Sequence, residues 1–223
     1  MYNDVEGRIY VMLEKLIPKY MRLPVVCLLL LNVVTYFGTR FFTTGRTHYD
    51  WSLPIDDTLP LVTGMISVYI LAYVQWVVGY KVIGRESRNL CYRMYSGEMI
   101  AKLICLFFFL CFPTTIMRPE ITGTGIFDQL TKLIYSMDAP DNLFPSIHCL
   151  ESYVCFRGAM YTKRVPIWYK YVMLVMTVLV FASTVLVKQH VVVDILGAVC
   201  AVEIGLLVSK RFKMDRIFEK MGS

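Results

Sequence analysis

The sequence predicts an all-α, polytopic membrane protein built as a six-helix bundle. Hydrophobic residues make up 57% of the 223 residues and charged residues only 18%, whereas a typical soluble domain has about 45–50% and about 25%. The mean hydropathy is +0.54. This composition excludes a disordered chain and is untypical of a soluble enzyme. Six spans of roughly 20 residues use more than half of the chain, so we expect one membrane domain over residues 1–223.

The first element is expected within residues 1–22 and is amphipathic. Apolar side chains recur there at helical spacing, and charged residues occupy the positions between them. This pattern is typical of a helix that lies in the membrane interface, and the many charges argue against a cleavable signal peptide. The apolar positions are Ile9, Leu13, Leu16, Ile17 and Tyr20.

Six apolar segments follow over residues 23–209, and a basic tail occupies residues 210–223. The fourth segment is the shortest and begins with polar residues. In the third, Glu98 and Lys102 stand four residues apart in the first turns, where we expect the pair at the lipid headgroups. The predicted spans are 23–42, 59–79, 96–116, 146–162, 165–187 and 190–208.

Basic residues determine the predicted orientation. With six spans both termini lie on one side, and that side holds most of the Lys and Arg residues between the apolar segments. By the positive-inside rule the termini and the basic tail are cytoplasmic, and the loops 43–58 and 117–145 face outward. Because the net charge of +6 arises between apolar segments, it favours contact with membrane lipids and not with nucleic acid. The seven Cys residues form no CxxC pair, which argues against a disulfide framework or a zinc site.

Several residues with chemical potential converge on the outward end of the predicted bundle. The chain has three His residues, and two of them begin spans: His148 the fourth and His190 the sixth. Arg118 ends the third span, and Lys188 stands two residues before His190. Because these positions share one membrane side and depth, we expect them to surround a common site.

His190 and Asp194 form one local pattern. Residues four apart on a helix share a face, so the carboxylate can accept a hydrogen bond from one ring nitrogen and leave the other free to attack. A charged residue within a membrane span is costly and usually has a functional partner. A structural pair that ties down a helix end is the alternative interpretation.

The segment FPSIH places a second His in the first turn of the fourth span. Pro145 lacks an N–H and Ser146 is a favourable N-cap, so the two predict a helix start. Such a start offers backbone N–H groups to an anion, and His148 is placed to donate a proton to a leaving oxygen. An ordinary helix cap beside an incidental interfacial His is the alternative.

Arg118, Lys188 and Ser146 form the predicted phosphate-binding set. A guanidinium binds two phosphate oxygens at once, whereas an ammonium acts as a point charge. Either side chain could instead extend to the lipid headgroups, and for Lys188 taken alone that is the favoured interpretation. For Glu203, deep in the sixth span, we expect only a polar contact between helices.

Three segments resemble the motifs of the type 2 phosphatidic acid phosphatase superfamily of membrane enzymes: KxxxxxxRP, PSGH and SRxxxxxHxxxD. Here they read CFPTTIMRP, PSIH and STVLVKQHVVVD, and the resemblance covers roughly residues 95–200. The order along the chain matches, and so does the spacing of Ser183, His190 and Asp194 in the third motif.

The chain departs from these motifs at three positions. Cys111 stands at the motif Lys, Thr184 at the motif Arg and Ile147 at the motif Gly. In the family that Lys and Arg bind phosphate, so two positive charges are missing and Lys188 is the expected partial substitute. PSIH and KQH are more similar to the branch of inositol-phosphosphingolipid and sphingomyelin synthases, which transfer a phosphoryl headgroup to an alcohol.

The resemblance implies a metal-independent lipid phosphatase without a cofactor and with an extracytoplasmic active site. His190 would attack the phosphorus of a lipid phosphomonoester or pyrophosphate and form a phosphohistidine. Asp194 would orient His190, and His148 would protonate the leaving group. Two alternatives stay open: a phosphotransferase that moves a phosphoryl headgroup between lipid and alcohol, and a non-catalytic protein that binds anionic headgroups through Arg118 and Lys188.

Overall fold

The computed structural model of the 223-residue chain describes residue 14 and residues 17–221. In this part of the chain helices are joined by loops, with two isolated β-bridges and no strand. The all-α prediction is therefore confirmed for the described residues. Most of the amphipathic helix expected within residues 1–22 lies outside them.

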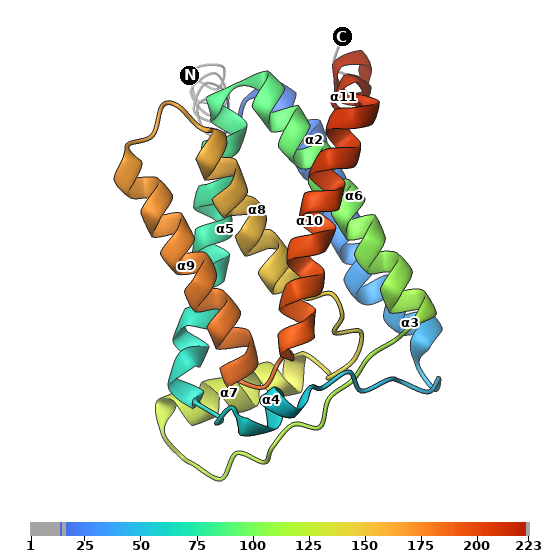
Figure 1. The fold of residues 1–223 in the computed structure, drawn as a ribbon, viewed down its shortest axis with the longest axis vertical. Coiled ribbons are helices and arrows are strands. Elements are labelled where there is room, and N and C mark those ends of the chain that lie inside the picture. The colour runs from blue at the N-terminus through green and yellow to red at the C-terminus, as the bar shows by residue number, and fades with distance from the viewer. Residues whose placement is uncertain (1–13, 15–16, 222–223) are drawn as a thin grey trace, which may run out of the picture.

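The helices run back and forth along one direction, with the two short helices α4 and α7 at one end (Figure 1). In chain order they are α2 (Lys19–Val33), the π-helical turn η1 (Val34–Gly38), α3 (Thr39–Thr43), α4 (Pro54–Thr58), the 3₁₀ turn η2 (Thr63–Met65), α5 (Ile66–Glu86), α6 (Arg88–Cys111), α7 (Ile126–Met137), α8 (Ile147–Tyr161), α9 (Ile167–Leu186), α10 (Val192–Phe212) and α11 (Asp215–Met221).

Five helical stretches are long and apolar enough to cross a membrane, so the chain is a membrane protein by length and composition. Large apolar side chains on their outer faces, such as Val77 and Leu207, are exposed, as they are in helices that face lipid. The five stretches are Lys19–Thr43, Thr63–Glu86, Arg88–Cys111, Ile167–Leu186 and Val192–Phe212.

The predicted fourth span is the helix α8, and it differs from the other five. It has 15 residues and is therefore about 22 Å long, shorter than a bilayer core of about 30 Å. Helices α5, α6, α9 and α10 all pack against it, so it lies inside the bundle rather than at the lipid-facing surface. The structure thus shows five of the six predicted spans as long apolar helices and the fourth as a shorter, enclosed one.

The helices α5 and α6 extend beyond their apolar segments. The charged residue Glu86 ends α5, and the charged residue Arg88 begins α6. Only Ser87 separates the two helices, and its side chain accepts a hydrogen bond from the Leu90 N–H. Hydropathy marks only the apolar part of a helix, while the cap determines where it begins. For this reason the predicted span 96–116 is shifted relative to the observed helix, which starts earlier and ends at Cys111.

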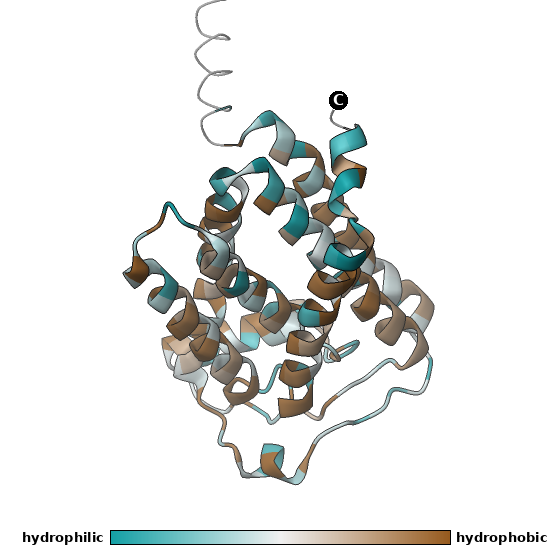
Figure 2. Cartoon of the chain, turned by 45° about the horizontal axis from the view of Figure 1, so that its top comes forward, coloured by the Kyte–Doolittle hydropathy of each residue, from teal (hydrophilic) through white to brown (hydrophobic). Residues whose placement is uncertain are grey.

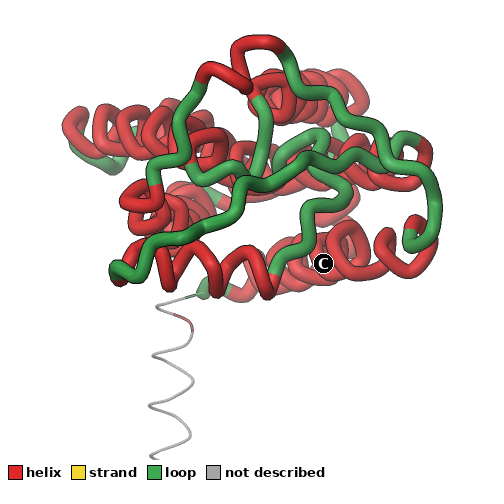
Figure 3. The backbone as a smooth tube through the Cα atoms, turned by 90° about the horizontal axis from the view of Figure 1, so that it is seen from below, coloured by secondary structure: helices red, strands yellow, loops and turns green. Residues whose placement is uncertain are grey.

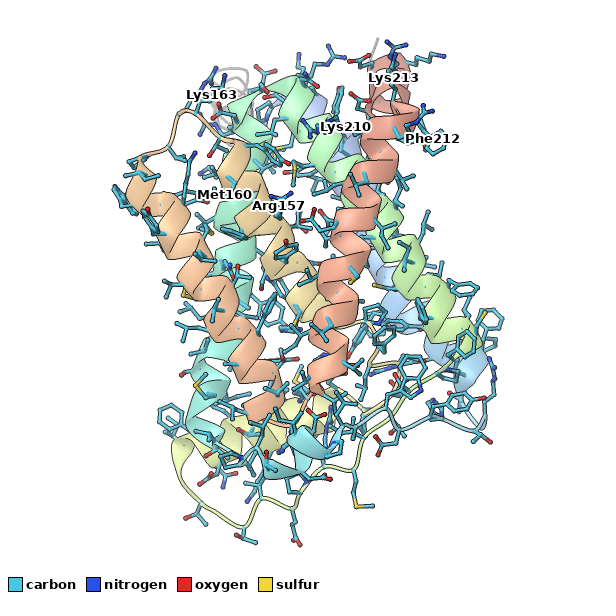
Figure 4. The ribbon with its side chains drawn as sticks, in the orientation of Figure 1. Arg157, Met160, Lys163, Lys210, Phe212 and Lys213 are labelled. Atoms are coloured by element: carbon cyan, nitrogen blue, oxygen red, sulfur yellow. The ribbon has the colours of Figure 1, made fainter. Side chains whose placement is uncertain are left out.

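The two ends of the bundle differ. At one end α2 begins and α5, α8 and α10 finish (Figure 1), and hydrophilic residues gather there (Figure 2). Lys163, Lys210 and Lys213 lie at this end (Figure 4). At the opposite end α8 and α10 begin, and long loops cross the helix ends (Figure 3). The predicted site residues all belong to this second end, here called the loop end.

The helices α6 and α10 pack together through glycine. A Cβ atom at Gly205 would lie 2.2 Å from the carbonyl oxygen of Gly97, which no real Cβ contact allows. The two backbones can therefore approach only because Gly205 has no side chain. This contact fixes α10, and with it His190 and Asp194, against the third span.

Polar side chains in the middle of the bundle form ion pairs between helices. The Lys102 Nζ lies 3.0 Å from Glu98 Oε1 and 2.9 Å from Glu151 Oε1 of α8. Glu98 is 0% exposed, so the expectation that this pair faces the lipid headgroups is wrong. The reason is the third partner: a carboxylate on α8 draws the lysine into the bundle interior.

A second ion pair joins α8 to α10. The Arg157 Nε lies 2.6 Å from Glu203 Oε1, and the Tyr153 hydroxyl donates to the same carboxylate at 2.8 Å. Figure 4 shows Arg157 on the side of α8 that faces α10. The prediction that Glu203 makes a polar contact between helices is confirmed.

Candidate active site

A tight turn between α9 and α10 places His190 at the start of α10. The backbone N–H groups of Gln189 and His190 both donate to the carbonyl of Thr184, at 2.9 and 3.1 Å. Lys188 adopts the left-handed conformation with φ 53°, which is uncommon for a residue with a side chain. The chain therefore reverses direction within a few residues, and the three polar side chains from 188 to 190 occupy the loop end.

His190 and Asp194 make the predicted hydrogen bond. The His190 Nδ1 lies 3.0 Å from Asp194 Oδ2, and the exposed fractions of the two side chains are 12% and 1%. The same carboxylate oxygen accepts the Val191 N–H at 3.1 Å, at the first turn of α10. Asp194 thus caps α10 and, with the same oxygen atom, orients the imidazole of His190. The pairing leaves Nε2 of His190 as the ring nitrogen available for chemistry.

His190 lines a cavity of about 480 Å³ at the loop end. The wall of this cavity also contains Arg118 and Lys188, so three of the predicted site residues meet there. The remaining lining residues are Ser52, Asp56, Asp57, Leu59, Leu61, Ile116, Met117, Pro119, Val185 and Val191.

Arg118 is held in the cavity wall by neutral partners. One terminal nitrogen donates to the carbonyl of Asp138 at 2.5 Å, and the other donates to the side-chain oxygen of Gln189. The guanidinium carbon lies 4.6 Å from the ring centroid of Tyr135 in α7. Burial lowers the pKa of Arg118 from its ordinary value, yet a guanidinium stays charged at any pH a protein tolerates. The site thus contains a fixed positive charge without a carboxylate bonded to it.

Lys188 is also held by neutral partners. Its Nζ donates to the backbone carbonyls of Asp56 and Leu59, at 2.8 and 2.7 Å. An ammonium has three N–H donors, so one remains for another acceptor. The structure therefore places this side chain at the cavity, tied to α4.

Ser146 caps α8 but does not line the cavity. Its side chain accepts the Cys149 N–H at 3.3 Å, as predicted for an N-cap. Its own backbone N–H donates to the carbonyl of Asp194 at 3.2 Å, and its side chain is fully buried. The contact joins the beginnings of α8 and α10, so Ser146 positions the two histidine-bearing helices. A direct contact of Ser146 with phosphate stays a prediction.

His148 sits among aromatic rings of α5. The ring of Tyr69 stacks on it at 4.0 Å between centroids and 15° between planes, and Tyr73 and Trp76 make edge contacts at 5.4 and 4.7 Å. Its Nε2 is buried and has no hydrogen-bond partner among the described residues. His148 is not among the residues that line the cavity, but the contact between Ser146 and Asp194 joins the beginnings of the two histidine-bearing helices.

Several residues that shape the site were not predicted from the sequence. Asp56 accepts the Val192 N–H at 2.8 Å and so binds α4 to the first turn of α10. Its partner is distant in sequence, so no local pattern indicates the contact. Gln189, directly before His190, was detectable as a polar residue in an apolar run, but its role in holding Arg118 depends on the folded loop. Tyr69 and Tyr135 contact His148 and Arg118, and both contacts join different elements of the fold, so no local pattern indicates them.

In the described part of the chain, His, Cys, Asp and Glu side chains form no group of three or more suited to a metal ion. That the reaction needs no metal and no cofactor stays a prediction.

No family model matches the chain, and neither the curated proteins nor the solved structures contain a match. The resemblance to the type 2 phosphatidic acid phosphatase superfamily therefore depends on the three motifs alone.

Proposed function

We propose that the chain is an integral membrane lipid phosphatase that hydrolyses a lipid phosphomonoester or pyrophosphate through a phosphohistidine. The observation that carries this proposal is the His190–Asp194 pair, whose imidazole lines a cavity that also contains Arg118 and Lys188. A nucleophile, an orienting carboxylate and two cations are the parts that attack on a phosphoryl group requires.

In the first step Nε2 of His190 attacks phosphorus and the bond from phosphorus to the lipid oxygen breaks. Asp194 accepts the hydrogen bond from Nδ1, so it stabilises the positive charge that develops on the ring. Arg118 and Lys188 bind the phosphoryl oxygens as negative charge accumulates on them. The imidazole of His148, which takes up a proton as the phosphate anion binds beside it, gives this proton to the departing lipid alcohol.

In the second step water replaces the histidine. Neutral His148 accepts a proton from the water molecule as its oxygen attacks phosphorus, and the bond from phosphorus to His190 breaks. Inorganic phosphate leaves, and both histidines return to their starting state. The stacking of Tyr69 against His148 keeps the ring in one plane through both proton transfers.

The proposal places the loop end of the bundle outside the cytoplasm and counts α8 as the fourth span. The distribution of basic residues supports this orientation, because Lys163, Lys210 and Lys213 lie at the opposite end (Figure 4). A substrate in the outer leaflet would then reach the cavity from the side where α4 and α7 lie.

A phosphotransferase is the second candidate. Its support is the pair of departures from the phosphatase motifs, Cys111 and Thr184, and the resemblance of PSIH to the synthase branch. In this version an alcohol takes the place of water in the second step and His148 accepts its proton. The same cavity serves both reactions.

The test is a substrate screen with the purified protein. Phosphate release is measured from lipid phosphates and pyrophosphates for wild type, His190→Ala and the control His48→Ala, which removes a histidine outside the cavity. We expect His190→Ala to lower turnover by about 10³-fold or more, because the nucleophile is gone, and His48→Ala to match wild type. Full activity in His190→Ala contradicts the proposal.

Added inositol or another alcohol separates the two candidates, since only a transferase yields a new lipid. Binding of anionic lipid without any turnover in wild type would instead identify the non-catalytic protein.

A further inference from the structure

The helix α7 exposes an apolar stripe at the loop end. Ile126, Leu133 and Met137 form this stripe, and they are 73%, 52% and 68% exposed. Their spacing of seven and four residues places the three side chains on one side of the helix. The polar side chains of Gln129 and Ser136 are exposed too and lie on the adjoining side. The surface of α7 that the described part of the chain leaves uncovered is therefore amphipathic.

Another side of α7 anchors the helix at the level where two spans meet the loop end. Leu130 and Ile134 pack against a cluster of buried apolar side chains. The cluster consists of Ile66, Tyr69 and Val187. The first two lie in the first turn of α5, and Val187 directly follows α9. The helix thus crosses the place where α5 begins and α9 finishes (Figure 1), which is the depth at which spans leave the hydrocarbon core.

Polar contacts fix the rotation of α7 about its own axis. The Tyr135 hydroxyl donates to the carbonyl of Val187 at 2.7 Å, and the Lys132 Nζ donates to the carbonyl of Gly123 at 2.9 Å. The ring of Tyr135 also lies against the guanidinium of Arg118, 4.6 Å from its carbon. A rotation that buried the apolar stripe would break these contacts, so the stripe stays on the outside.

Lipid is the partner that suits the stripe. The spans on which α7 rests expose apolar side chains on their outer faces, such as Val74 of α5 and Val178 of α9, at 56% each. The bilayer that covers those faces ends at the level of α7. Three large apolar side chains in water are unfavourable, whereas an apolar stripe beside polar side chains is typical of helices that lie in the membrane interface.

We propose that α7 is an interfacial membrane-binding helix whose stripe of Ile126, Leu133 and Met137 inserts among the lipids of the leaflet at the loop end. Gln129 and Ser136 then face water. This inference goes beyond the proposed function, because it concerns how the loop end binds the bilayer. Through Tyr135 the same helix contacts Arg118, so the lipid surface supports one wall of the cavity.

The experiment places a single nitroxide label on α7 in protein reconstituted into phosphatidylcholine vesicles. Leu133→Cys and Met137→Cys carry the label on the stripe, and Gln129→Cys and Ser136→Cys are the matched controls on the polar side of the same helix. In the parent protein alanine replaces the cysteines that are exposed or half-buried: Cys27, Cys111 and Cys200. Electron paramagnetic resonance measures collisions of each label with oxygen, which concentrates in hydrocarbon, and with a neutral nickel chelate, which stays in water.

We expect the ratio of oxygen to nickel collisions to be severalfold higher at positions 133 and 137 than at 129 and 136. All four side chains are exposed, so the label fits without a change in the fold. Equal ratios on the two sides would mean that the stripe faces water, and they overturn the inference. Labels at 133 and 137 that meet neither reagent would be covered by protein, such as a second copy of the chain, and this result overturns it as well. Neither measurement uses phosphatase activity, so the outcome is independent of the proposed function.

Discussion

Two lysines in the same bundle are held in opposite ways. In the bundle interior the ammonium of Lys102 lies 3.0 and 2.9 Å from the carboxylates of Glu98 and Glu151. At the loop end the ammonium of Lys188 donates to two backbone carbonyls at 2.8 and 2.7 Å. Carboxylates neutralise a cation, whereas carbonyls hold it in place and leave its charge uncompensated. The comparison therefore separates a cation that holds helices together from one that is ready for an anion.

Arg118 and Arg157 repeat this difference. Arg157 lies 2.6 Å from the carboxylate of Glu203 and joins two helices. Arg118 donates to a backbone carbonyl and to an amide oxygen, and it lines the cavity with His190. Around the cavity the charges of Arg118 and Lys188 thus have no carboxylate bonded to them, while in the interior the charges of Lys102 and Arg157 are compensated by carboxylates. The arrangement favours binding of phosphate at the loop end only.

The largest effect on stability is expected in the interior. Replacing Lys102 with Met leaves the carboxylates of Glu98 and Glu151 buried without their cation, which should lower the free energy of unfolding by about 3–5 kcal/mol. Denaturation of the purified variant in detergent measures this loss. The triple variant Lys102→Met, Glu98→Gln, Glu151→Gln removes the charges together and should recover much of it. Equal stability of wild type and Lys102→Met would contradict the conclusion that Lys102, unlike Lys188, holds helices together.

The corresponding change at the cavity should affect activity more than stability. Arg118→Ala removes a preorganised charge from the phosphoryl site, and we expect turnover to fall by about 10²–10³-fold. Arg118→Lys should recover little, because an ammonium cannot donate to Asp138 and Gln189 with the same geometry. Parallel assays of activity and unfolding are the check. If Arg118→Ala lost as much stability as Lys102→Met but kept wild-type turnover, Arg118 would be a structural residue and not a phosphate-binding one.

The smallest effect concerns the ring that stacks on His148. Tyr69→Leu removes the stacking and should cost about 0.5–1.5 kcal/mol of stability, with a further loss of turnover because His148 is no longer held in one plane. Tyr69→Phe keeps the ring and should resemble wild type. The comparison of these two variants in both assays separates stacking from the hydroxyl group. A Phe variant as impaired as the Leu variant would exclude the stacking argument.

The parts of the fold that are local in sequence were predictable. Apolar segments indicate the helices, and the spacing of His190 and Asp194 determines their hydrogen bond because both lie in one helical turn. The cap at Ser146 is local in the same sense.

The parts that depend on distant residues were not predictable. The placement of Lys102 depends on Glu151 in another helix, and that of Lys188 depends on carbonyls near residues 56–59. The length of α8 depends on where its cap and the following turn fall, and hydropathy does not record this. A sequence pattern therefore identifies candidate cations, but only the fold decides which are neutralised.

The most direct test of the account is to locate the phosphoryl group during turnover. Wild type and His148→Ala are mixed with a lipid phosphate that carries a labelled phosphoryl group, quenched at neutral or alkaline pH and analysed by peptide mass spectrometry. The account predicts label on His190 in both proteins, and once unlabelled lipid is added the label should persist longer in His148→Ala, because loss of the general acid–base group slows hydrolysis of the intermediate. Turnover of the lipid without label on His190, at time points when product is forming, would contradict it.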